Sequence, residues 1–496
     1  MGGSIVYYDR MCFDNKIVLQ KKMRKNIILL TAFLLCAVLA QAKITLPSVI
    51  SDDMVLQQST EVRLWGWGAP AEKVEVSTSW DEKAQTKVNK DGKWSVLLRT
   101  PQASYQLQTL TINDISLNVL VGEVWLAGGQ SNMEMPLKGF AGACVKNGTL
   151  DAMRAAQEAP FVRMFNIEKS QKFTPQDNCK GKWLSPTFDN ALQFSATAYY
   201  YASLMSNALN VPVGIINCSY GGTRVESWCS AETCSKYPDV PVDSVGICTG
   251  AKYPWERAVV TYNAMFHPIS LYTVKGIIWY QGCSNVNDPK HYAERLSTMV
   301  RQWRDEMALG NIPFYQVQIA PYIYGDSENG ISGALLREQQ FLSCDMIPNS
   351  DIICTNDLVE PYERHNIHPR EKRTVGLRLA MLALNKTYGM KDLPYSGPRY
   401  DASKLSISAD TVTVGFTTNN YGICRNYALE GFEIAGEDRV FHAAKADFHW
   451  QTNTVTLTSA NVPRPVAVRY CFKDFQIGNM IGGGELPLFP FRSDNW

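Results

Sequence analysis

Four polar clusters in this chain carry residue types that suit ester chemistry. Ser131 lies in GGQSNM, Gly221 and Gly222 in SYGGTRVESW, Gln281 in QGCSNVND, and His368 in NDLVEPYERHNIHP. A serine hydroxyl is a weak nucleophile until an imidazole within hydrogen-bond reach accepts its proton. Taken alone, GGQSN is also an ordinary turn sequence, since glycine, serine and asparagine are typical turn residues. Whether Ser131 is a nucleophile therefore depends on whether the fold brings the four clusters together.

Each cluster follows a short apolar run that is typical of a buried strand. These runs cover residues 124–127, 213–218, 277–280 and 352–355, and helix-like segments separate them in the sequence. One such segment, residues 291–307, places its apolar side chains on one helical face. Strands that alternate with helices predict a parallel sheet with helices on both faces, and these sheets bind ligands at the carboxyl ends of their strands. We therefore expect the four clusters to meet at that end of the sheet.

The regions on either side of this predicted sheet have a different pattern. Residues 43–118 and 395–496 contain apolar residues that alternate with polar ones, which is typical of strands with one buried face. The sequence therefore predicts an α/β fold in three parts. A central domain with this parallel sheet, at residues 119–394, would stand between two β-sandwich-like domains.

The first 42 residues have the pattern of an export signal. Basic residues at 21–25 precede an apolar stretch at 27–39, and Ala40-Gln41-Ala42 offers a cleavage site with small residues. A second methionine, Met23, indicates that residues 1–22 are an over-extended start. The apolar stretch is short for a membrane span. We therefore expect an exported protein, periplasmic or extracellular, without a membrane anchor.

Composition narrows the ligand class. The 496 residues carry a net charge of +1 without long runs of like charge, so nothing favours nucleic acid as a partner. His365 and His368 could suggest a metal pair, but there are only six histidines and no companion ligand cluster, so we expect neither metal nor cofactor. Cys229 and Cys234 form either a local disulfide or two buried free thiols.

Five motifs carry a resemblance to a known family: GEVWLAGGQSNMEMPL, YGGTRVESW, YNAMFHPI, WYQGCSN and IHPREKRTVGLRLA. The chain resembles the sialate O-acetylesterase-like members of the serine esterases with the SGNH, or flavodoxin-like, hydrolase fold, over nearly all of its length after the predicted signal. The resemblance implies that Ser131 is the nucleophile and His368 the general base. For the oxyanion hole we choose the backbone N–H groups of Ser131 and of Gly222, or Gly221, together with the Gln281 side-chain amide.

Two positions depart from the family pattern. Relatives usually have Gln-Gly-Glu where this chain has Cys283 as the third residue, and His365 stands where many enzymes of this fold have an aspartate three residues before the histidine. The group that orients His368 must therefore come from elsewhere. The candidates, in order, are Asp357, then Glu360 and Glu363, with the Asn366 amide as a further possibility.

The expected function is removal of O-acetyl groups from carbohydrate, and the resemblance favours O-acetylated sialic acids. Arg224 suits a sugar carboxylate, and Asn132 is a second candidate for substrate binding. One alternative is a deacetylase for polysaccharides such as acetylated xylan. Another is a carbohydrate-binding relative with a decayed site, which Cys283 and the missing aspartate would fit. The preferred acetyl position and the oligomeric state do not follow from the sequence.

Overall fold

The computed structural model describes residue 25 and residues 43–242, 253–325, 330–418, 422–424 and 428–496. The predicted signal segment lies outside these residues apart from Lys25. The described chain divides into two compact units, the smaller comprising residues up to 46, 65–75 and 85–95. The larger unit holds every residue discussed below as part of a site. No helix within the described ranges is long and apolar enough to cross a membrane.

A seven-strand run forms the central sheet of the larger unit. Its order is β13 (Ser350–Ile353), β12 (Phe314–Val317), β11 (Gly276–Tyr280), β7 (Ile115–Gly129), β10 (Val213–Ser219), β8 (Val162–Asn166) and β9 (Trp183–Leu184). All neighbouring pairs are parallel except β8 and β9. The predicted α/β fold with a parallel sheet is therefore confirmed.

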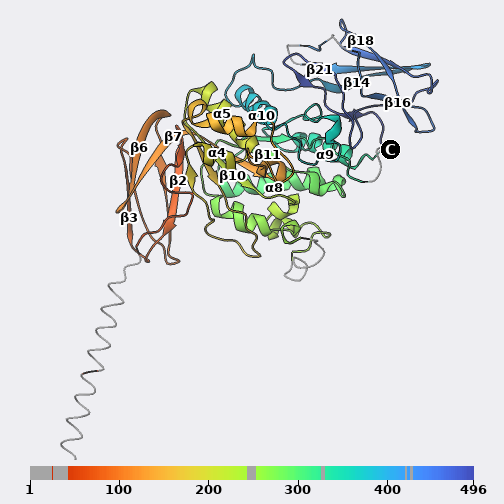
Figure 1. Ribbon diagram of the computed structural model, residues 1–496. Helices are drawn as coiled ribbons and strands as arrows, with labels where there is room; N and C mark the ends of the chain where they lie inside the picture. The colour runs from red at the N-terminus through yellow and green to blue at the C-terminus, as the bar shows by residue number, and fades with distance from the viewer. Residues whose placement is uncertain (1–24, 26–42, 243–252, 326–329, 419–421, 425–427) are drawn as a thin grey trace, which may run out of the picture. The chain divides into compact units, whose positions relative to one another are not determined.

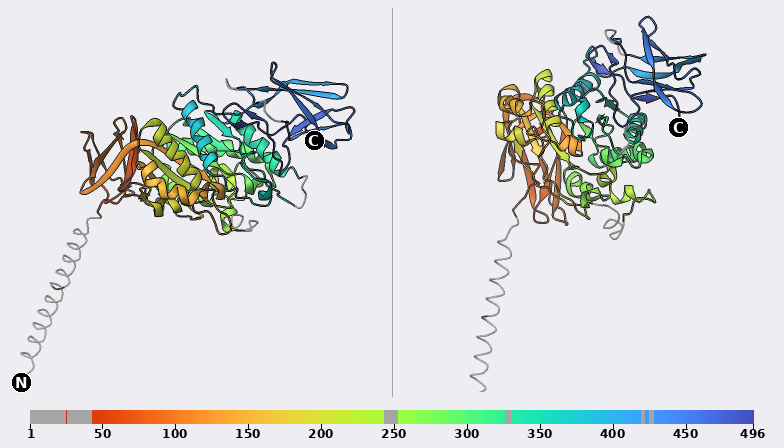
Figure 2. Two further views of the ribbon diagram at one scale, coloured as in Figure 1. Left: turned by 45° about the horizontal axis from the view of Figure 1, so that its top comes forward. Right: turned by 45° about the vertical axis from the view of Figure 1, so that its right-hand side comes forward.

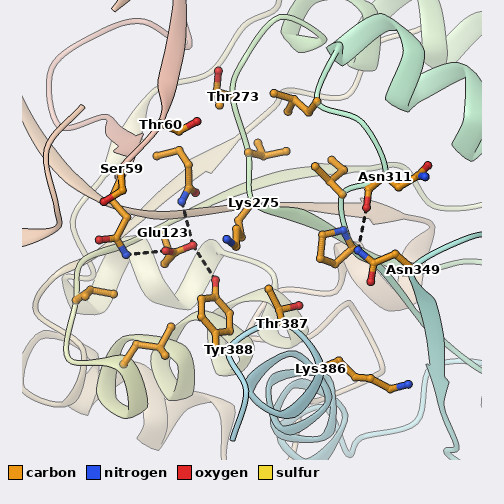
Figure 3. A pocket seen from close by; sticks show the side chains of 18 of the residues that line it. Ser59, Thr60, Glu123, Thr273, Lys275, Asn311, Asn349, Lys386, Thr387 and Tyr388 are labelled. Carbon is orange, nitrogen blue, oxygen red and sulfur yellow. Dashed lines mark hydrogen bonds between the residues drawn. The ribbon is translucent and has the colours of Figure 1, made fainter. Parts of the chain in front are cut away.

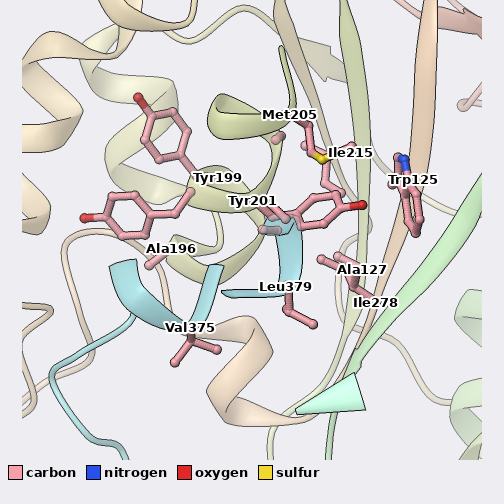
Figure 4. Packing of buried hydrophobic residues seen from close by; sticks show 14 of the residues in the cluster. Trp125, Ala127, Ala196, Tyr199, Tyr201, Met205, Ile215, Ile278, Val375 and Leu379 are labelled. Carbon is pink, nitrogen blue, oxygen red and sulfur yellow. The ribbon is translucent and has the colours of Figure 1, made fainter. Parts of the chain in front are cut away.

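Helices cover both faces of this sheet (Figure 1). On one face, α5 (Ala196–Leu209) and α10 (Arg373–Lys386) pack on alternate strand residues, among them Trp125, Ala127 and Ile278 (Figure 4). On the other face lie α8 (Tyr292–Met307) and α9 (Ser332–Met346). The ring of Trp279 meets Trp303 of α8 with 5.6 Å between centroids. Side chains of a strand point alternately to its two faces, so successive apolar residues serve both helix layers.

The remaining helices are short or lie at the edges of the sheet. They are α2 (Ser131–Glu134), α3 (Gly148–Glu158), α4 (Phe188–Gln193) and α6 (Ala231–Cys234), with 3₁₀ turns at Val225–Trp228, Pro254–Glu256, His267–Ile269, Cys283–Asn285, Pro289–His291 and Pro361–Glu363 and a π-helical turn at Tyr262–Phe266. Helix α2 matters most for function, because it begins two residues after β7 ends.

Strand β7 belongs to two sheet regions at once. Its first half pairs with β1 (Val55–Gln57) and β6 (Ser104–Ile112), and residues 123–129 pair with β10 while residues 125–129 pair with β11. The other early strands are β2 (Glu61–Trp67), β3 (Lys73–Thr78), β4 (Lys83–Lys87) and β5 (Lys93–Arg99). The expected boundary between residues 118 and 119 thus falls inside a continuous strand.

The C-terminal region is rich in strands, as expected. One sheet has the order β14 (Arg399–Ser408), β15 (Thr411–Thr417), β19 (Thr454–Thr458), β18 (Lys445–His449), and a second has β17 (Phe441–Ala443), β16 (Phe432–Ala435), β20 (Ala467–Tyr470), β23 (Phe491–Arg492). The short pair β21 (Ile481–Gly482) and β22 (Leu486–Pro487) completes it. Figure 2 shows the two larger sheets as facing layers, and their inward residues, such as Val414 and Ile434, form one core.

The cysteines of the described ranges are all free. Cys229 and Cys234 are buried, and their thiols donate to the backbone carbonyls of Val225 and Glu226. Of the two alternatives for this pair, the structure therefore has the buried free thiols rather than the disulfide.

Candidate functional site

The end of β7 explains why two glycines precede Ser131. Gly129 has φ +140°, and a Cβ atom there would lie 2.2 Å from the carbonyl oxygen of Tyr280 on the neighbouring strand β11. The Gln130 N–H donates to that same oxygen at 3.0 Å. Only glycine permits this close approach. The chain then turns directly into α2, so Ser131 stands at the carboxyl end of the central strand.

The glycine loop after β10 lies against Ser131. A Cβ atom at Gly221 would lie 3.2 Å from the Cβ of Ser131, and the Gly221 N–H donates to Glu134 Oε2 at 2.6 Å. The other oxygen of Glu134 accepts from Lys169 at 2.7 Å. Glu134 therefore fixes the loop beside the serine. Glu134 was not predicted from the sequence as part of the site, because its partner Gly221 lies 87 positions away and nothing in the local sequence links the two.

Two backbone N–H groups near the serine are available as donors. Across the described ranges, no residue accepts from the N–H of Ser131 or of Gly222. The N–H of Gly221 is taken by Glu134, so Gly222 is the better of the two glycines for an oxyanion hole. Gly222 also has φ +78°, a conformation that glycine adopts without strain.

The Gln281 side chain conflicts with its predicted role. It is fully buried, and its amide donates to the Thr223 carbonyl at 3.1 Å and to Asn285 Oδ1 at 2.9 Å, while its oxygen accepts from Tyr292. A primary amide has two hydrogens, and both are used. Gln281 therefore holds the loops after β10 and β11 together and has no hydrogen left for an oxyanion.

Asn132 likewise has a different role from the predicted one. The residue is 1% exposed, and its amide donates to the Ile367 carbonyl at 3.0 Å. Asn132 therefore ties α2 to the segment that carries His368, the residue directly after Ile367, although these segments are far apart in the sequence.

His368 is half-buried beside this link. Its backbone N–H donates to Asn366 Oδ1 at 3.0 Å, and its ring meets Phe140 edge to face, with 5.2 Å between centroids. Within the described chain, the imidazole has no hydrogen bond to Ser131. In catalytic sites such bonds often tighten only when substrate is bound. Asn366 therefore orients the backbone at His368, not the ring.

Burial and, to a smaller extent, the positive charge of Lys372 together lower the pKa of His368 to about 4. Lys372 is itself fully buried, and burial lowers its own pKa to about 7, with the carboxylates of Glu363 and Glu371 opposing that shift. The imidazole is therefore neutral at neutral pH, which is the form a general base requires. Lys372 was not predicted from the sequence as part of the site, because a lysine at the start of a helix is usually exposed.

The first candidate for orienting His368 is engaged elsewhere. Both carboxylate oxygens of Asp357 accept from Arg378, at 2.7 and 2.6 Å. Arg378 also donates to the carbonyl of Glu485 in the C-terminal region. This bidentate pair conflicts with the prediction that Asp357 holds the imidazole.

Neither fallback candidate is hydrogen-bonded to the ring in the part of the chain that the structure describes. Glu363 is buried, and its two oxygens accept from the backbone N–H groups of Glu360 and Arg370. Glu360 is exposed. Among the residues that the structure describes, no carboxylate is hydrogen-bonded to the His368 ring. Ser131 and His368 thus form at most a dyad in this geometry.

Cys283 is a buried thiol, and burial raises its pKa, with Tyr324, Lys372 and Arg337 exerting smaller opposing effects. It is therefore neutral at neutral pH and unsuited as a nucleophile. The Nε and Nη1 atoms of Arg337 and the Tyr324 hydroxyl are buried without hydrogen-bond partners. A carboxylate at position 283 would lie among these donors.

The Arg224 side chain, next to the glycine loop in the sequence, is partly exposed to solvent. Its side chain is 39% exposed, and its Nε lies 3.5 Å from Glu226 Oε2. Glu226 is buried and is also bound by Arg295 at 2.5 Å and by Asn285 at 3.1 Å. Glu226 therefore braces the glycine loop, and part of the Arg224 side chain stays exposed to solvent.

A cavity of about 920 Å³ lies at the opposite, amino end of the strands. Buried Glu123 in its wall accepts from Gln57, Gln58 and the Tyr388 hydroxyl (Figure 3). Glu123 lies six positions before Gly129 on β7, which at the usual rise per residue is about 20 Å. None of the predicted site residues lies in this wall.

The known proteins to which this chain is similar include esterases, which fits the geometry of the site. Residues 121–385 match the family described as carbohydrate esterase, sialic acid-specific acetylesterase. The human sialate O-acetylesterase is 29% identical over 391 residues, which cover 71% of this chain and 72% of the human protein. The mouse sialate O-acetylesterase is 27% identical over 415 residues, covering 71% of this chain and 75% of its own.

A solved structure extends the similarity to the flanking regions. A carbohydrate acetylesterase from Xanthomonas citri is 33% identical, covers 92% of this chain and 100% of its own, and superposes with a TM-score of 0.80. The fold, the polar strand ends and these matches agree on a carboxylic ester hydrolase. The chain therefore belongs to the sialic acid-specific acetylesterase family of carbohydrate esterases.

Proposed function

We propose that this protein is an exported serine esterase that removes O-acetyl groups from carbohydrate, with O-acetylated sialic acids as its substrates. Export is inferred from the signal pattern of residues 1–42. The three-part division at 43–118, 119–394 and 395–496 is part of the same proposal, with residues 119–394 carrying the chemistry. The choice of sialic acid rests on the family and on its mammalian relatives.

The proposed reaction is acyl transfer through Ser131. The serine oxygen attacks the acetyl carbonyl carbon, and His368 accepts the serine proton. The N–H groups of Ser131 and Gly222 donate to the oxyanion, and loss of one such donor typically raises the barrier by about 2.7–4 kcal/mol. His368 then protonates the departing sugar oxygen. Water attacks the acetyl-serine in the second half of the reaction and releases acetate.

One observation carries the proposal. Ser131 follows the central strand directly, beside a glycine loop, and both it and Gly222 have N–H groups without acceptors among the described residues. A turn residue would need no such arrangement. The contact of Asn132 with Ile367 supports the approach of His368 to the same place.

The test is acetate release from methyl acetate and from an O-acetylated N-acetylneuraminic acid, measured for the parent, Ser131→Ala and Asp357→Asn. We expect Ser131→Ala to fall to background. We expect Asp357→Asn to lose less than about tenfold in kcat, because the carboxylate serves Arg378; loss of a triad acid costs about 10⁴. A parent that is folded but inactive would favour the carbohydrate-binding alternative.

A second candidate is a polysaccharide deacetylase of the acetylxylan type. The Xanthomonas citri relative, which matches nearly the whole chain, is described only as a carbohydrate acetylesterase. Comparison of kcat/KM on acetylated xylan and on the acetylated sialic acid separates the two. A higher value on xylan would replace sialic acid as the proposed substrate without affecting the roles of Ser131 and His368.

A further inference from the structure

Three aromatic side chains, Tyr220, Trp255 and Tyr253, form a stacked row that we name the aromatic ledge. The rings of Tyr253 and Trp255 are parallel within 2°, with 4.9 Å between centroids. Tyr220 stacks on Trp255 with 5.8 Å between centroids and an angle of 26°. Tyr220 lies directly after β10, whereas Trp255 and Tyr253 come from a 3₁₀ turn more than thirty residues later.

The ledge adjoins the serine through the glycine loop. A Cβ atom at Gly222 would lie 2.5 Å from the indole nitrogen of Trp255, so the indole packs directly on this glycine. Gly221, the preceding residue, is in contact with Ser131. An acetyl ester joins its sugar by a single oxygen. A sugar whose acetyl group reaches Ser131 therefore has its ring within reach of Trp255.

The ledge is not part of the hydrophobic core. Tyr253 is 40% exposed, and Tyr220 and Trp255 are half-buried. Large aromatic rings that remain partly exposed in one contiguous row are typical of binding surfaces. Because the rings stack on one another, they cover part of each other's faces, and the ring edges and the remaining faces are left for a ligand. This apolar surface suits the C–H face of a pyranose, whose hydroxyls stay free for hydrogen bonds.

Polar contacts fix the ledge before any ligand binds. The Tyr220 hydroxyl donates to Gln171 at 2.9 Å, and the Trp255 carbonyl accepts from Ser227 at 3.0 Å. The chain after Trp255 is strained, since buried Val259 has φ +64°, which is rare for a β-branched residue. Strain of this kind persists where the surrounding structure imposes it, and it is frequent at ligand sites.

Two cations border this surface. Lys169 lies 5.3 Å from the centroid of Tyr220 and pairs with Glu134, and Arg224, two positions after Gly222, has a side chain that is 39% exposed. An apolar row with cations nearby suits a sugar ring that also carries an anionic group.

We propose that the aromatic ledge is the sugar subsite of this enzyme and packs against the pyranose ring that bears the acetyl group. This inference rests on the proposed function, because it assumes that the ester is cleaved at Ser131. Trp255 is then the residue that distinguishes an acetylated sugar from a small acetate ester.

The test compares kcat/KM on an O-acetylated N-acetylneuraminic acid with kcat/KM on methyl acetate, which has no ring to stack. Trp255→Ala is expected to lower the ratio of these two values at least about tenfold, mainly through KM for the sugar, and Trp255→Phe to retain most of it. Tyr253→Ala, at an exposed position, gives a second variant if Trp255→Ala does not fold. The control is Trp450→Ala, an exposed tryptophan of the C-terminal region.

If the parent is active and the ratio is unchanged in both Trp255→Ala and Tyr253→Ala, the sugar-subsite proposal is overturned and the proposed function is not. An inactive parent, or an active Ser131→Ala, overturns the proposed function instead. Calorimetry gives a readout that is independent of turnover. It measures the binding of N-acetylneuraminic acid to Ser131→Ala and to the double variant Ser131→Ala, Trp255→Ala. Loss of that binding in the double variant is the result expected, and equal affinity would contradict the ledge.

Discussion

His368 illustrates how the surroundings of one residue set its chemistry. Burial and the charge of Lys372 both disfavour the imidazolium, and no carboxylate among the described residues opposes them at the ring. The proposed general base is therefore available over a wide pH range but is a weak base. A carboxylate partner would raise its pKa and strengthen it.

This environment predicts the pH dependence of the esterase. Because His368 must be neutral to accept a proton and has a pKa of about 4, we expect kcat/KM on methyl acetate to stay level from neutral pH to about 5 and to fall near pH 4. Lys372→Met removes a positive charge, so the pKa of His368 rises and the acidic fall moves to higher pH. Lys445→Met, on an exposed strand, is the control. An acidic fall near pH 6.5 in the parent, unchanged by Lys372→Met, would contradict this account.

At the scale of elements, the junction between β7 and α2 positions the serine. The junction depends on close approach between neighbouring strands, which leaves no room for a side chain at Gly129. The same constraint applies at Gly128, where a Cβ atom would lie 2.8 Å from the Trp279 ring. The two glycines before Gln130 and Ser131 are thus required by the packing against β11 as well as by the turn.

Gly129→Ala tests this constraint. We expect it to lower the free energy of unfolding, measured with urea, by more than about 3 kcal/mol, since it combines a backbone clash with an unfavourable φ. Gly142 is the matched control, because it also has a positive φ, +77°, but open space around it. Gly142→Ala should cost only about 1 kcal/mol. Equal losses for the two variants would show that the contact with Tyr280 is not the cause.

The elements could be predicted from the sequence more fully than the hydrogen bonds. Apolar runs followed by polar clusters predict strand ends, and the sheet has all four. The partners of Gln281 and Asp357 could not be predicted, because each has several acceptors or donors within reach and only the packing selects one. Arg378 lies on α10, 21 positions after Asp357, and nothing in the local sequence links the two. The position of Trp255 beside the site could not be predicted either, because it depends on the packing of the indole on Gly222.

At the scale of the whole molecule, the C-terminal region is bonded to the hydrolase helices. Asp474 is 2% exposed, and its carboxylate accepts from the Gly333 N–H at the start of α9 at 2.6 Å. Arg492 forms a bidentate pair with Glu338 on the same helix, with both distances 2.8 Å. These contacts lie within one compact unit.

Asp474→Ala should therefore destabilise the hydrolase region and not only the strands around it. It leaves a buried N–H without an acceptor, so we expect a loss of about 1–3 kcal/mol in the free energy of unfolding. Asp474→Asn keeps an oxygen at the same place and should lose less. Thermal unfolding followed by tryptophan fluorescence measures the difference. An unchanged midpoint in Asp474→Ala would mean that this link contributes nothing to stability.

The continuity of strand β7 limits how this protein can have changed during evolution. Residues 115–122 complete the N-terminal sheet, and the same strand continues to Gly129 and delivers Ser131. A recombination event at residue 118 would split the central strand of the hydrolase sheet. The N-terminal strands and the nucleophile should therefore have been inherited together, whereas a module joined only through loops can be exchanged freely.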